Sequence, residues 1–347
     1  MATKRVLVVG LGNMGMSHAL AYTRIPGFTV AGVCTRHIAG KTLPEALAGA
    51  NRFSEFEQAL QELKPDVVSI NTLPDTHADY AIKSMEAGAH VFVEKPLAET
   101  VESAERVVET ARGTGRKLVI GYILRHHPSW LKFIEIARML GKPLVFRMNL
   151  NQQSNGETWE WHKRLMASFP PIVDCGVHYV DIMCQMTPAR PTRVHALGAR
   201  LTDEVPSYNY GALQVAFDDG SVGWYEAGWG PMMSETAFFV KDVIGPKGSV
   251  SIVMAETARD VKSDDINAHT KTNQILWHHA DMSKPDERID MTDEPDHDAL
   301  CEREQRFLLD AIDNGRDLGS HMDDAVKSLK IVLAADESVR TGQVVML

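Results

Sequence analysis

The sequence lacks the features that mark several classes of protein. No apolar run approaches the roughly 20 residues that cross a bilayer, so we expect no membrane partner. The formal net charge is −10, which argues against a nucleic-acid partner. The four cysteines have no C-x-x-C spacing, a pattern typical of reduced thiols in a reducing compartment. The first residues, MATKRVLVV, lead directly into an apolar run, so we expect no signal peptide and a cytoplasmic location.

A strand, a glycine-rich turn and a helix open the chain. Val6–Val9 is an apolar, β-prone run of the kind buried in parallel sheets. Glycines then follow in G-x-G-x-x-G spacing, and the apolar run Val30–Cys34 closes a βαβ unit. Such glycines allow a tight turn, let the backbone approach a pyrophosphate and let the helix pack on the strand. The alternative is a turn that binds nothing, but the context predicts a dinucleotide site formed by Gly10, Gly12, Asn13, Met14 and Gly15.

The end of the second strand lacks the acidic residue that NAD-binding units usually place against the ribose 2′-hydroxyl. No Asp or Glu occurs between Phe28 and Pro44. Arg36 is instead available to pair with a 2′-phosphate, with the Thr35 hydroxyl as a further donor. This pattern favours NADP(H) as the cofactor, while NAD(H) stays open. The alternative for Arg36 is an ordinary surface charge.

Two later apolar strands end in polar loops. The run Asp66–Asn71 leads into Thr72–His77, and the run Val91–Val93 leads into Glu94–Pro96. Ligands of open α/β sheets bind beyond the carboxyl ends of the strands. We therefore expect Lys95 to lie close to the nicotinamide, rather than to be a solvated surface charge.

After Gly121 the alternation of polar and apolar residues becomes that of strands. Hairpin signals such as Asp219-Gly220 favour a largely antiparallel sheet. The expected strands are Leu144–Leu150, Arg193–Ala199, Tyr210–Phe217, Ser221–Ala227, Glu235–Lys241 and Gly248–Val253. We predict an α/β protein in which residues 1–122 form a doubly wound Rossmann domain. Residues 123–347 form an α+β domain for substrate binding and oligomerisation, whose terminal helices are free to pack back on the first domain.

The stretch from Asp174 to Asp181 reads DCGVHYVD. If it is helical, Asp174 and His178 are one turn apart and lie on the same face. Two interpretations stay open from the spacing alone. In one, Asp174 caps the helix and His178 is a half-buried packing residue. In the other, the two side chains belong to a catalytic site.

The order of the segments GLGNMG, TLPDTH and VFVEKPLAET resembles the family of glucose–fructose oxidoreductase, inositol dehydrogenase and MocA. The resemblance covers essentially the whole chain. Its most specific mark here is E-K-P, and the second half matches the family's D-x-G-x-H-x-x-D. It implies that Lys95 lies by the substrate hydroxyl and the nicotinamide, with Asp174 and His178 beside it. In some members the bond before this proline is cis, which would place a cis bond before Pro96.

The resemblance also implies further contacts and partners. Cofactor contacts beyond the glycine turn are expected at Thr72, Leu73, His77, Glu94 and Lys95. A face of the C-terminal sheet forms the contact between copies, which implies a homodimer or a homotetramer. One departure is visible. Where relatives carry a run of glycines, this chain has Ser168-Phe169-Pro170-Pro171-Ile172, so we expect a stiffer, more apolar loop. The identity of the substrate therefore cannot be transferred from relatives.

These features predict an NAD(P)-dependent oxidoreductase that acts on a CH–OH group of a sugar, an inositol-like polyol or a sugar derivative. His178 is the expected general base because an imidazole titrates near neutral pH. Lys95 is expected to bond the same oxygen and stabilise its developing negative charge, while Asp174 orients the pair. The inverted assignment stays open, with Lys95 as the base and its pKa lowered in a cleft.

Further substrate contacts are expected from aromatic and cationic side chains. Arg125 lies in the joint between the domains, and aromatic faces suit the C–H faces of a sugar ring. The alternative for the tryptophans is core packing. The candidates are Tyr122, Arg125, Trp161, Lys163 and Trp229. The pairs His126-His127 and His278-His279 have no further ligands at suitable spacing, so we expect no metal site.

Two other functions stay open. One is a glycoside hydrolase that oxidises a ring hydroxyl, eliminates the aglycone and returns the hydride, with no net change of cofactor. The other is a sensor that binds NADP(H) without turnover. A sensor would not need Lys95, Asp174 and His178 together, so their presence counts against it.

Overall fold

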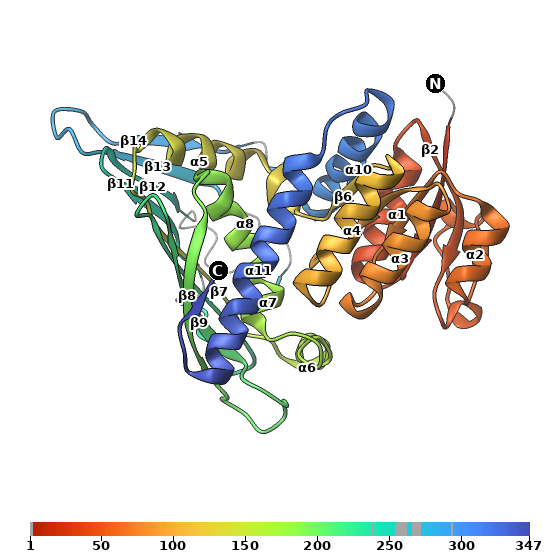
Figure 1. Cartoon of the computed structure of the whole chain (residues 1–347), viewed down its shortest axis with the longest axis horizontal. Helices are drawn as coiled ribbons and strands as arrows, with labels where there is room; N and C mark the ends of the chain where they lie inside the picture. Colours follow the sequence, from red (N-terminus) through yellow and green to blue (C-terminus); the bar gives the residue numbers. More distant parts are fainter. Residues whose placement is uncertain (1–2, 237–238, 254–261, 266–271, 293) are drawn as a thin grey trace. The chain divides into compact units, whose positions relative to one another are not determined.

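The structure is a computed structural model that describes residues 3–236, 239–253, 262–265, 272–292 and 294–347 (Figure 1). By its internal contacts the chain divides into two units. The first comprises Met1–Ile123 and Pro295–Val326, and the second comprises Leu124–Glu294 and Lys327–Leu347. Among the described residues, every helix is too short or too polar to span a lipid bilayer.

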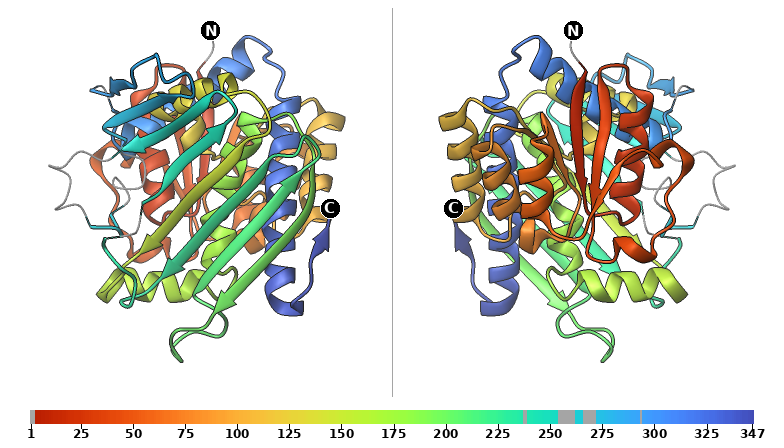
Figure 2. Two further views of the ribbon diagram at one scale, coloured as in Figure 1. Left: turned by 90° about the vertical axis from the view of Figure 1, so that its left-hand side faces the viewer. Right: turned by 90° about the vertical axis from the view of Figure 1, so that its right-hand side faces the viewer.

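Six parallel strands form the sheet of the first unit, in the order β3-β2-β1-β4-β5-β6 (Figure 2, right). The strands are β1 (Lys4–Val9), β2 (Phe28–Cys34), β3 (Asn51–Phe53), β4 (Val67–Ile70), β5 (His90–Val93) and β6 (Leu118–Ile120). The helices are α1 (Asn13–Arg24), α2 (Phe56–Leu63), α3 (Pro74–Glu86), α4 (Val101–Thr114) and α10 (His297–Asp313). The strand order reverses between β1 and β4, so the predicted doubly wound Rossmann fold is confirmed.

The core of the first unit explains why its strands read as continuous apolar runs. Val6 of β1, Val67 of β4 and Phe92 of β5 are fully buried in one cluster. Leu308 and Ala311 of α10 belong to the same cluster, and α10 packs against α1. Residues from late in the sequence therefore complete this core.

Nine strands form the sheet of the second unit, in the order β14-β13-β12-β11-β7-β10-β9-β8-β15. Only the β7–β10 pair is parallel among the described strands of this sheet, so the predicted mostly antiparallel sheet is confirmed. The strands are β7 (Val145–Gln152), β8 (Pro191–Ala199), β9 (Tyr210–Phe217), β10 (Val222–Trp229), β11 (Lys241–Gly245), β12 (Gly248–Val253), β13 (Gln274–His279), β14 (Glu287–Asp290) and β15 (Val345–Met346).

One predicted strand is misplaced. The strand expected at Glu235–Lys241 begins only at Lys241 and runs to Gly245, while residues 237–238 lie outside the described part of the chain. The reason is the hairpin that joins β11 to β12, in which Gly245 pairs with Gly248. The strand before such a turn must run directly into it.

Helices cover one face of the nine-stranded sheet. They are α5 (Pro128–Met139), α7 (Pro171–Asp174) and α8 (Gly176–Met186), and Figure 2 (left) shows the strands from the opposite face. The alternation along β7 follows from this layering. Phe146 and Met148 are buried, whereas Val145 and Arg147 are exposed. Two further helices of the chain are α6 (Gly156–Leu165) and α11 (Gly319–Thr341).

Candidate functional site

Three loops at the carboxyl edge of the parallel sheet carry most of the predicted cofactor residues. β1, β4 and β5 are neighbours in this sheet, and they lead into Gly10–Gly15, Thr72–His77 and Glu94–Pro96. The imidazole of His77 bridges the last two loops. Its Nδ1 lies 2.8 Å from the Pro96 carbonyl oxygen and its Nε2 lies 3.0 Å from that of Thr72. The candidate cofactor residues thus form one connected edge.

The glycine turn leaves room for a side chain at one of its three glycines. Gly10 has a φ of +81°, and a Cβ on it would lie 2.5 Å from the Asn71 carbonyl oxygen. A Cβ on Gly15 would lie 1.8 Å from the carbonyl oxygen of Gly10. At Gly12 no atom of the described residues lies within 4 Å of such a Cβ. The geometry is that of a tight turn and close helix packing, with open space over Gly12.

The start of α1 fits an anionic group. Gly12 is its N-cap residue, with φ −70° and ψ −165°, and within the part of the chain that the structure describes no side-chain hydrogen bond caps this end. Gly12 and Asn13 are exposed, and Met14 is half-buried. The first N–H groups of a helix have no partner inside the helix and attract phosphate. Together with the space over Gly12, this end of α1 fits a dinucleotide pyrophosphate.

The end of β2 carries charges of both signs. Arg36 is exposed, and Thr35 is half-buried, with its backbone N–H donating to the Phe53 carbonyl oxygen at 3.0 Å. Burial, followed by the negative charges of Glu55 and Glu57, raises the pKa of the Cys34 thiol to about 11. No acidic residue follows β2 directly in the sequence. Instead, Glu55 and Glu57, at the start of α2, bring negative charge close to the end of β2.

Thr72 and Leu73 are half-buried, whereas His77 is 1% exposed. Burial lowers the pKa of His77, and the hydrogen bonds to the Pro96 and Thr72 carbonyl oxygens oppose this shift. The ring therefore holds two loops together from inside the protein. Thr72 and Leu73 are thus the more accessible of the three predicted cofactor contacts in this segment.

The Glu94 carboxylate lies inside the first unit, where it is 7% exposed. Its Oε1 accepts a hydrogen bond from His18 Nε2 at 2.8 Å, and its Oε2 accepts one from the Lys95 backbone N–H at 3.2 Å. The side chain thus ties α1 to the end of β5. Lys95 is half-buried, and the Lys95–Pro96 bond is cis, as the resemblance implies.

Asp174 and His178 lie one turn apart on a nearly continuous helix. Cys175, which joins α7 to α8, has helical backbone angles of φ −81° and ψ −38°. Both side chains are half-buried. Asp174 is the last residue of α7, and Cys175 is the N-cap residue of α8. Both interpretations of the pair stay predictions. Lys95 belongs to the first unit, and Asp174 and His178 belong to the second.

Arg125 forms an ion pair with Asp181, the last acidic residue of the same motif. Its Nε donates to Asp181 Oδ2 at 2.7 Å, and its Nη2 donates to Asp181 Oδ1. The side chains are 13% and 1% exposed. A buried bidentate pair of this kind fixes the guanidinium, which limits its availability as the predicted substrate contact.

The two most buried substrate candidates are packed inside the protein. Trp229 is 1% exposed, its Nε1 donates to Gln152 Oε1 at 2.6 Å, and its ring stacks on His162 at 4.3 Å between centroids. Tyr122 is also 1% exposed, with its ring edge-on to His321. These placements favour packing roles over direct substrate contact.

Trp161 and Lys163 lie on α6 and are accessible. Trp161 is 41% exposed. The Lys163 ammonium lies 2.7 Å from Glu160 and 3.0 Å from Glu204, and hydrogen bonds to these two acids raise its pKa. Of the aromatic candidates, Trp161 is the most exposed, and the Arg164 guanidinium lies over its ring at 5.9 Å from the centroid.

Two family models match the chain. Residues 4–122 match the family model GFO_IDH_MocA, described as "Oxidoreductase family, NAD-binding Rossmann fold". Residues 135–347 match its companion, described as "Oxidoreductase family, C-terminal alpha/beta domain". This chain belongs to the Gfo/Idh/MocA oxidoreductase family. The resemblance seen in the motifs is confirmed.

Curated relatives in this family act on polyols and sugars. The chain is 28% identical to scyllo-inositol 2-dehydrogenase (NAD(+)) of Bacillus subtilis, over 99% of this chain and 96% of that protein. It is 27% identical to levoglucosan dehydrogenase of Pseudarthrobacter phenanthrenivorans, over 80% of this chain and 71% of that protein. Among solved structures, an NAD binding oxidoreductase from Klebsiella pneumoniae has a TM-score of 0.80 at 18% identity, covering 100% of this chain and 99% of that one.

Sequence reasoning missed contacts that hold residues near the predicted site residues within each unit. Asp181 appears in the motif, but its partner Arg125 lies far away in the sequence, so no spacing reveals the pair. His18 follows the last glycine of the turn by three residues, which one helical turn places on the core side of α1. Gln152 ends β7 and is recognisable only once Trp229 is placed beside it.

Proposed function

We propose that this chain is an NAD(P)-dependent dehydrogenase that oxidises a CH–OH group of a sugar, a polyol or a sugar derivative. The observation that carries the proposal is the connected edge of the parallel sheet. There, the open space over Gly12 and the uncapped start of α1 share an edge with the loop that bears Lys95. The names of the inositol and levoglucosan dehydrogenases among the relatives support the substrate class.

We assign the transfer of the substrate's hydroxyl proton, and the stabilisation of the negative charge on its oxygen, to three residues. The nicotinamide cofactor, when bound, supplies the hydride acceptor. His178 takes the hydroxyl proton, and Lys95 donates a hydrogen bond to the same oxygen and stabilises its negative charge. Asp174, one turn before His178, orients the imidazole and bonds a neighbouring hydroxyl. The half-buried state of all three side chains supports these roles, since each combines partial desolvation with access. The inverted assignment makes Lys95 the base.

The test is turnover of purified protein with NAD or NADP and a panel of inositols and sugars, followed by the absorbance of the reduced nicotinamide. Lys95→Ala and His178→Ala should each lower kcat by about 10²–10⁴-fold while cofactor binding survives. The controls are Lys284→Ala, an exposed lysine, and His195→Ala, a half-buried histidine outside the motif. Unchanged turnover in the two variants removes the assigned roles. Release of an aglycone without net reduction would favour the hydrolase instead.

For the cofactor we propose NADP(H), held at its 2′-phosphate by Arg36 and Thr35. The exposure of Arg36 at the end of β2 supports this choice, whereas the negative charges of Glu55 and Glu57 near Cys34 favour NAD(H). Arg36→Ala should lower kcat/KM for NADP by at least about 10-fold and leave that for NAD nearly unchanged. Arg52→Ala, which removes an exposed arginine from β3, is the control. A wild-type preference for NAD would reverse the assignment.

We propose that the chain forms a homodimer or homotetramer through the outer face of the nine-stranded sheet. Ile244, Val145 and Val222 are cross-strand neighbours on β11, β7 and β10, and they are 38%, 37% and 45% exposed. A contiguous apolar strip on a sheet surface marks a contact site. Val222→Lys should shift the mass measured by light scattering to that of a monomer. A monomeric wild type would contradict the proposal.

A further inference from the structure

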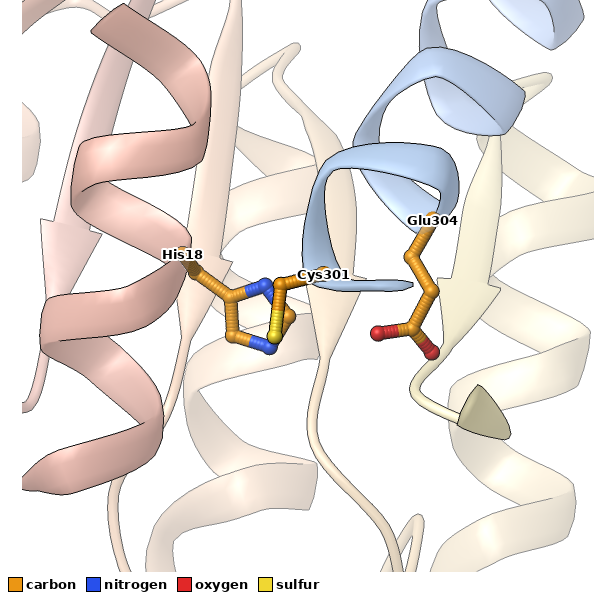
Figure 3. A group of neighbouring side chains, drawn as sticks. All are labelled: His18, Cys301 and Glu304. Atoms are coloured by element: carbon orange, nitrogen blue, oxygen red, sulfur yellow. The ribbon is translucent and has the colours of Figure 1, made fainter. Parts of the chain in front are cut away.

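A buried cluster joins α1 to α10 inside the first unit. His18 comes from α1, and Cys301 and Glu304 come from neighbouring turns of α10 (Figure 3). One donor atom from each residue lies within 4.8 Å of the other two. The three residues are 0%, 0% and 1% exposed. A nitrogen, a sulfur and an oxygen donor are therefore gathered in a space that water hardly reaches.

Glu304 is the residue of the cluster whose carboxyl group lacks hydrogen bonds from the described residues. Neither of its carboxyl oxygens has a hydrogen-bond partner among the described residues, although the side chain is buried and directed into the cluster (Figure 3). Burying a carboxyl without partners costs free energy. A cation beside these oxygens would offset this penalty.

His18 is oriented as metal-binding histidines commonly are. Its Nε2–H donates to Glu94 Oε1 at 2.8 Å, the carboxylate contact that fixes the ring of a metal-bound histidine. Its Nδ1 accepts a hydrogen bond of 2.9 Å from the amide of Gln305, whose Oε1 accepts from the Tyr22 hydroxyl. A metal bound through Nδ1 would displace the hydrogen bond to this amide.

We propose that His18, Cys301 and Glu304 bind a zinc ion that fastens α1 to α10. The donor set of imidazole, thiolate and carboxylate is one that zinc accepts in tetrahedral sites. Zinc bonds of about 2.0–2.3 Å place such donors about 3.5 Å apart, so donors that lie within 4.8 Å of one another must approach by at most about 1.3 Å when zinc binds.

The fourth position of the tetrahedron has a candidate ligand. His297 lies one turn before Cys301, and both of its ring nitrogens are 3.8 Å from the Cys301 sulfur. The site is structural, because its enclosed position leaves no room for a substrate. It is independent of the proposed dehydrogenase function, and its loss leaves the assignment of Lys95 and His178 untouched.

The test uses the full chain, stripped with a chelator and titrated with Zn²⁺ or Co²⁺ alone. We expect one ion per chain by elemental analysis, a thiolate charge-transfer band with Co²⁺, and a Tm that rises with Zn²⁺ concentration. Cys301→Ser and Glu304→Gln should each weaken binding by on the order of 100-fold and abolish the Tm shift. The controls are Cys34→Ser, another buried cysteine of this unit, and Glu302→Gln, which lies on the same helix.

Three results would overturn the site. The wild type binds no Zn²⁺, it binds Co²⁺ without a thiolate band, or the control variants weaken binding as much as the ligand variants do. The cobalt spectrum of the wild type decides the matter even if a variant fails to fold, since it requires no substitution.

Discussion

Arg125 donates hydrogen bonds to both carboxylate oxygens of Asp181, whose side chain is only 1% exposed. The pair connects the segment that precedes α5 to the middle of α8, the helix that carries His178. Two charges so enclosed are costly to separate, because each depends on the other for compensation.

Asp181→Ala should therefore destabilise the protein by about 3–5 kcal/mol, since it leaves the Arg125 guanidinium buried and uncompensated. The free energy of unfolding in urea measures the effect. The matched control is Asp218→Ala, which breaks the exposed ion pair between Asp218 and Arg190. The Arg190 side chain is 86% exposed and the Asp218 side chain is 36% exposed. That change should cost no more than about 1 kcal/mol. Equal losses in the two variants would show that enclosure does not govern the pair.

The glycines of the first turn should respond oppositely to alanine. Gly12→Ala places its Cβ in open space, so the protein should fold with unchanged Tm, while the dinucleotide, whose phosphates need that space, binds at least about 10-fold more weakly. Gly15→Ala drives a Cβ to 1.8 Å from the Gly10 carbonyl oxygen, so folding itself should fail or Tm should fall sharply. Thermal unfolding and fluorescence titration with NADH and NADPH separate the two effects. Normal cofactor affinity in Gly12→Ala would contradict the assignment of this turn.

His90 should make the protein less stable in mild acid. Burial, followed by the positive charges of Arg116, Lys117 and Lys4, lowers its pKa from 6.5 to about 4. Its Nδ1 also accepts the Lys117 backbone N–H at 2.9 Å, which only the unprotonated nitrogen can do.

Between these two pKa values the unfolded chain binds a proton at His90 and the folded chain does not. The stabilisation is therefore complete above pH 6.5 and is lost as the pH falls toward 4. Since His90 is partly exposed, we expect a loss of about 1–2 kcal/mol. Urea unfolding at several pH values gives the free energy of unfolding as a function of pH. The slope of this free energy against pH should be smaller for His90→Gln than for the wild type, and His37→Gln, at an exposed histidine, is the control. Equal slopes for His90→Gln and the wild type would contradict the shift.

Trp161 and Lys163 are the accessible candidates for substrate contact. Because both side chains lie at the surface of α6, Trp161→Ala and Lys163→Ala should leave stability within about 0.5 kcal/mol of the wild type. Each should raise KM for the substrate by about 10-fold with little change in kcat, which is the signature of uniform binding. Met282→Ala, at a side chain that is 84% exposed, controls for unspecific surface effects. An unchanged KM would limit α6 to a structural role.

The local features of this protein were predictable because they depend on short stretches of sequence. The turn at Gly10–Gly15 is fixed by the spacing of its glycines, and the one-turn separation of Asp174 and His178 by helical geometry. Strand boundaries were less predictable. The run ending at Lys241 alternates like a strand, yet the hairpin at Gly245 decides where pairing begins.

Features assembled from distant segments left no trace in the spacing of residues. The expectation of no metal site considered histidines that are adjacent in the sequence, whereas His18 and Cys301 meet only because α10 packs on α1. The same holds for Trp229, whose burial depends on Gln152 of a neighbouring strand. Aromatic residues predict a pocket and a core equally well until their neighbours are known.

The return of Pro295–Val326 to the first unit has a consequence for how the protein is made. A ribosome releases the six strands of the parallel sheet well before it synthesises α10. Until then the face of α1 that will receive Leu308 and Ala311 stays open to other chains and to chaperones. The nascent dinucleotide-binding half therefore cannot complete its core as it emerges, and must wait until strands β7 to β14 and then α10 have been translated.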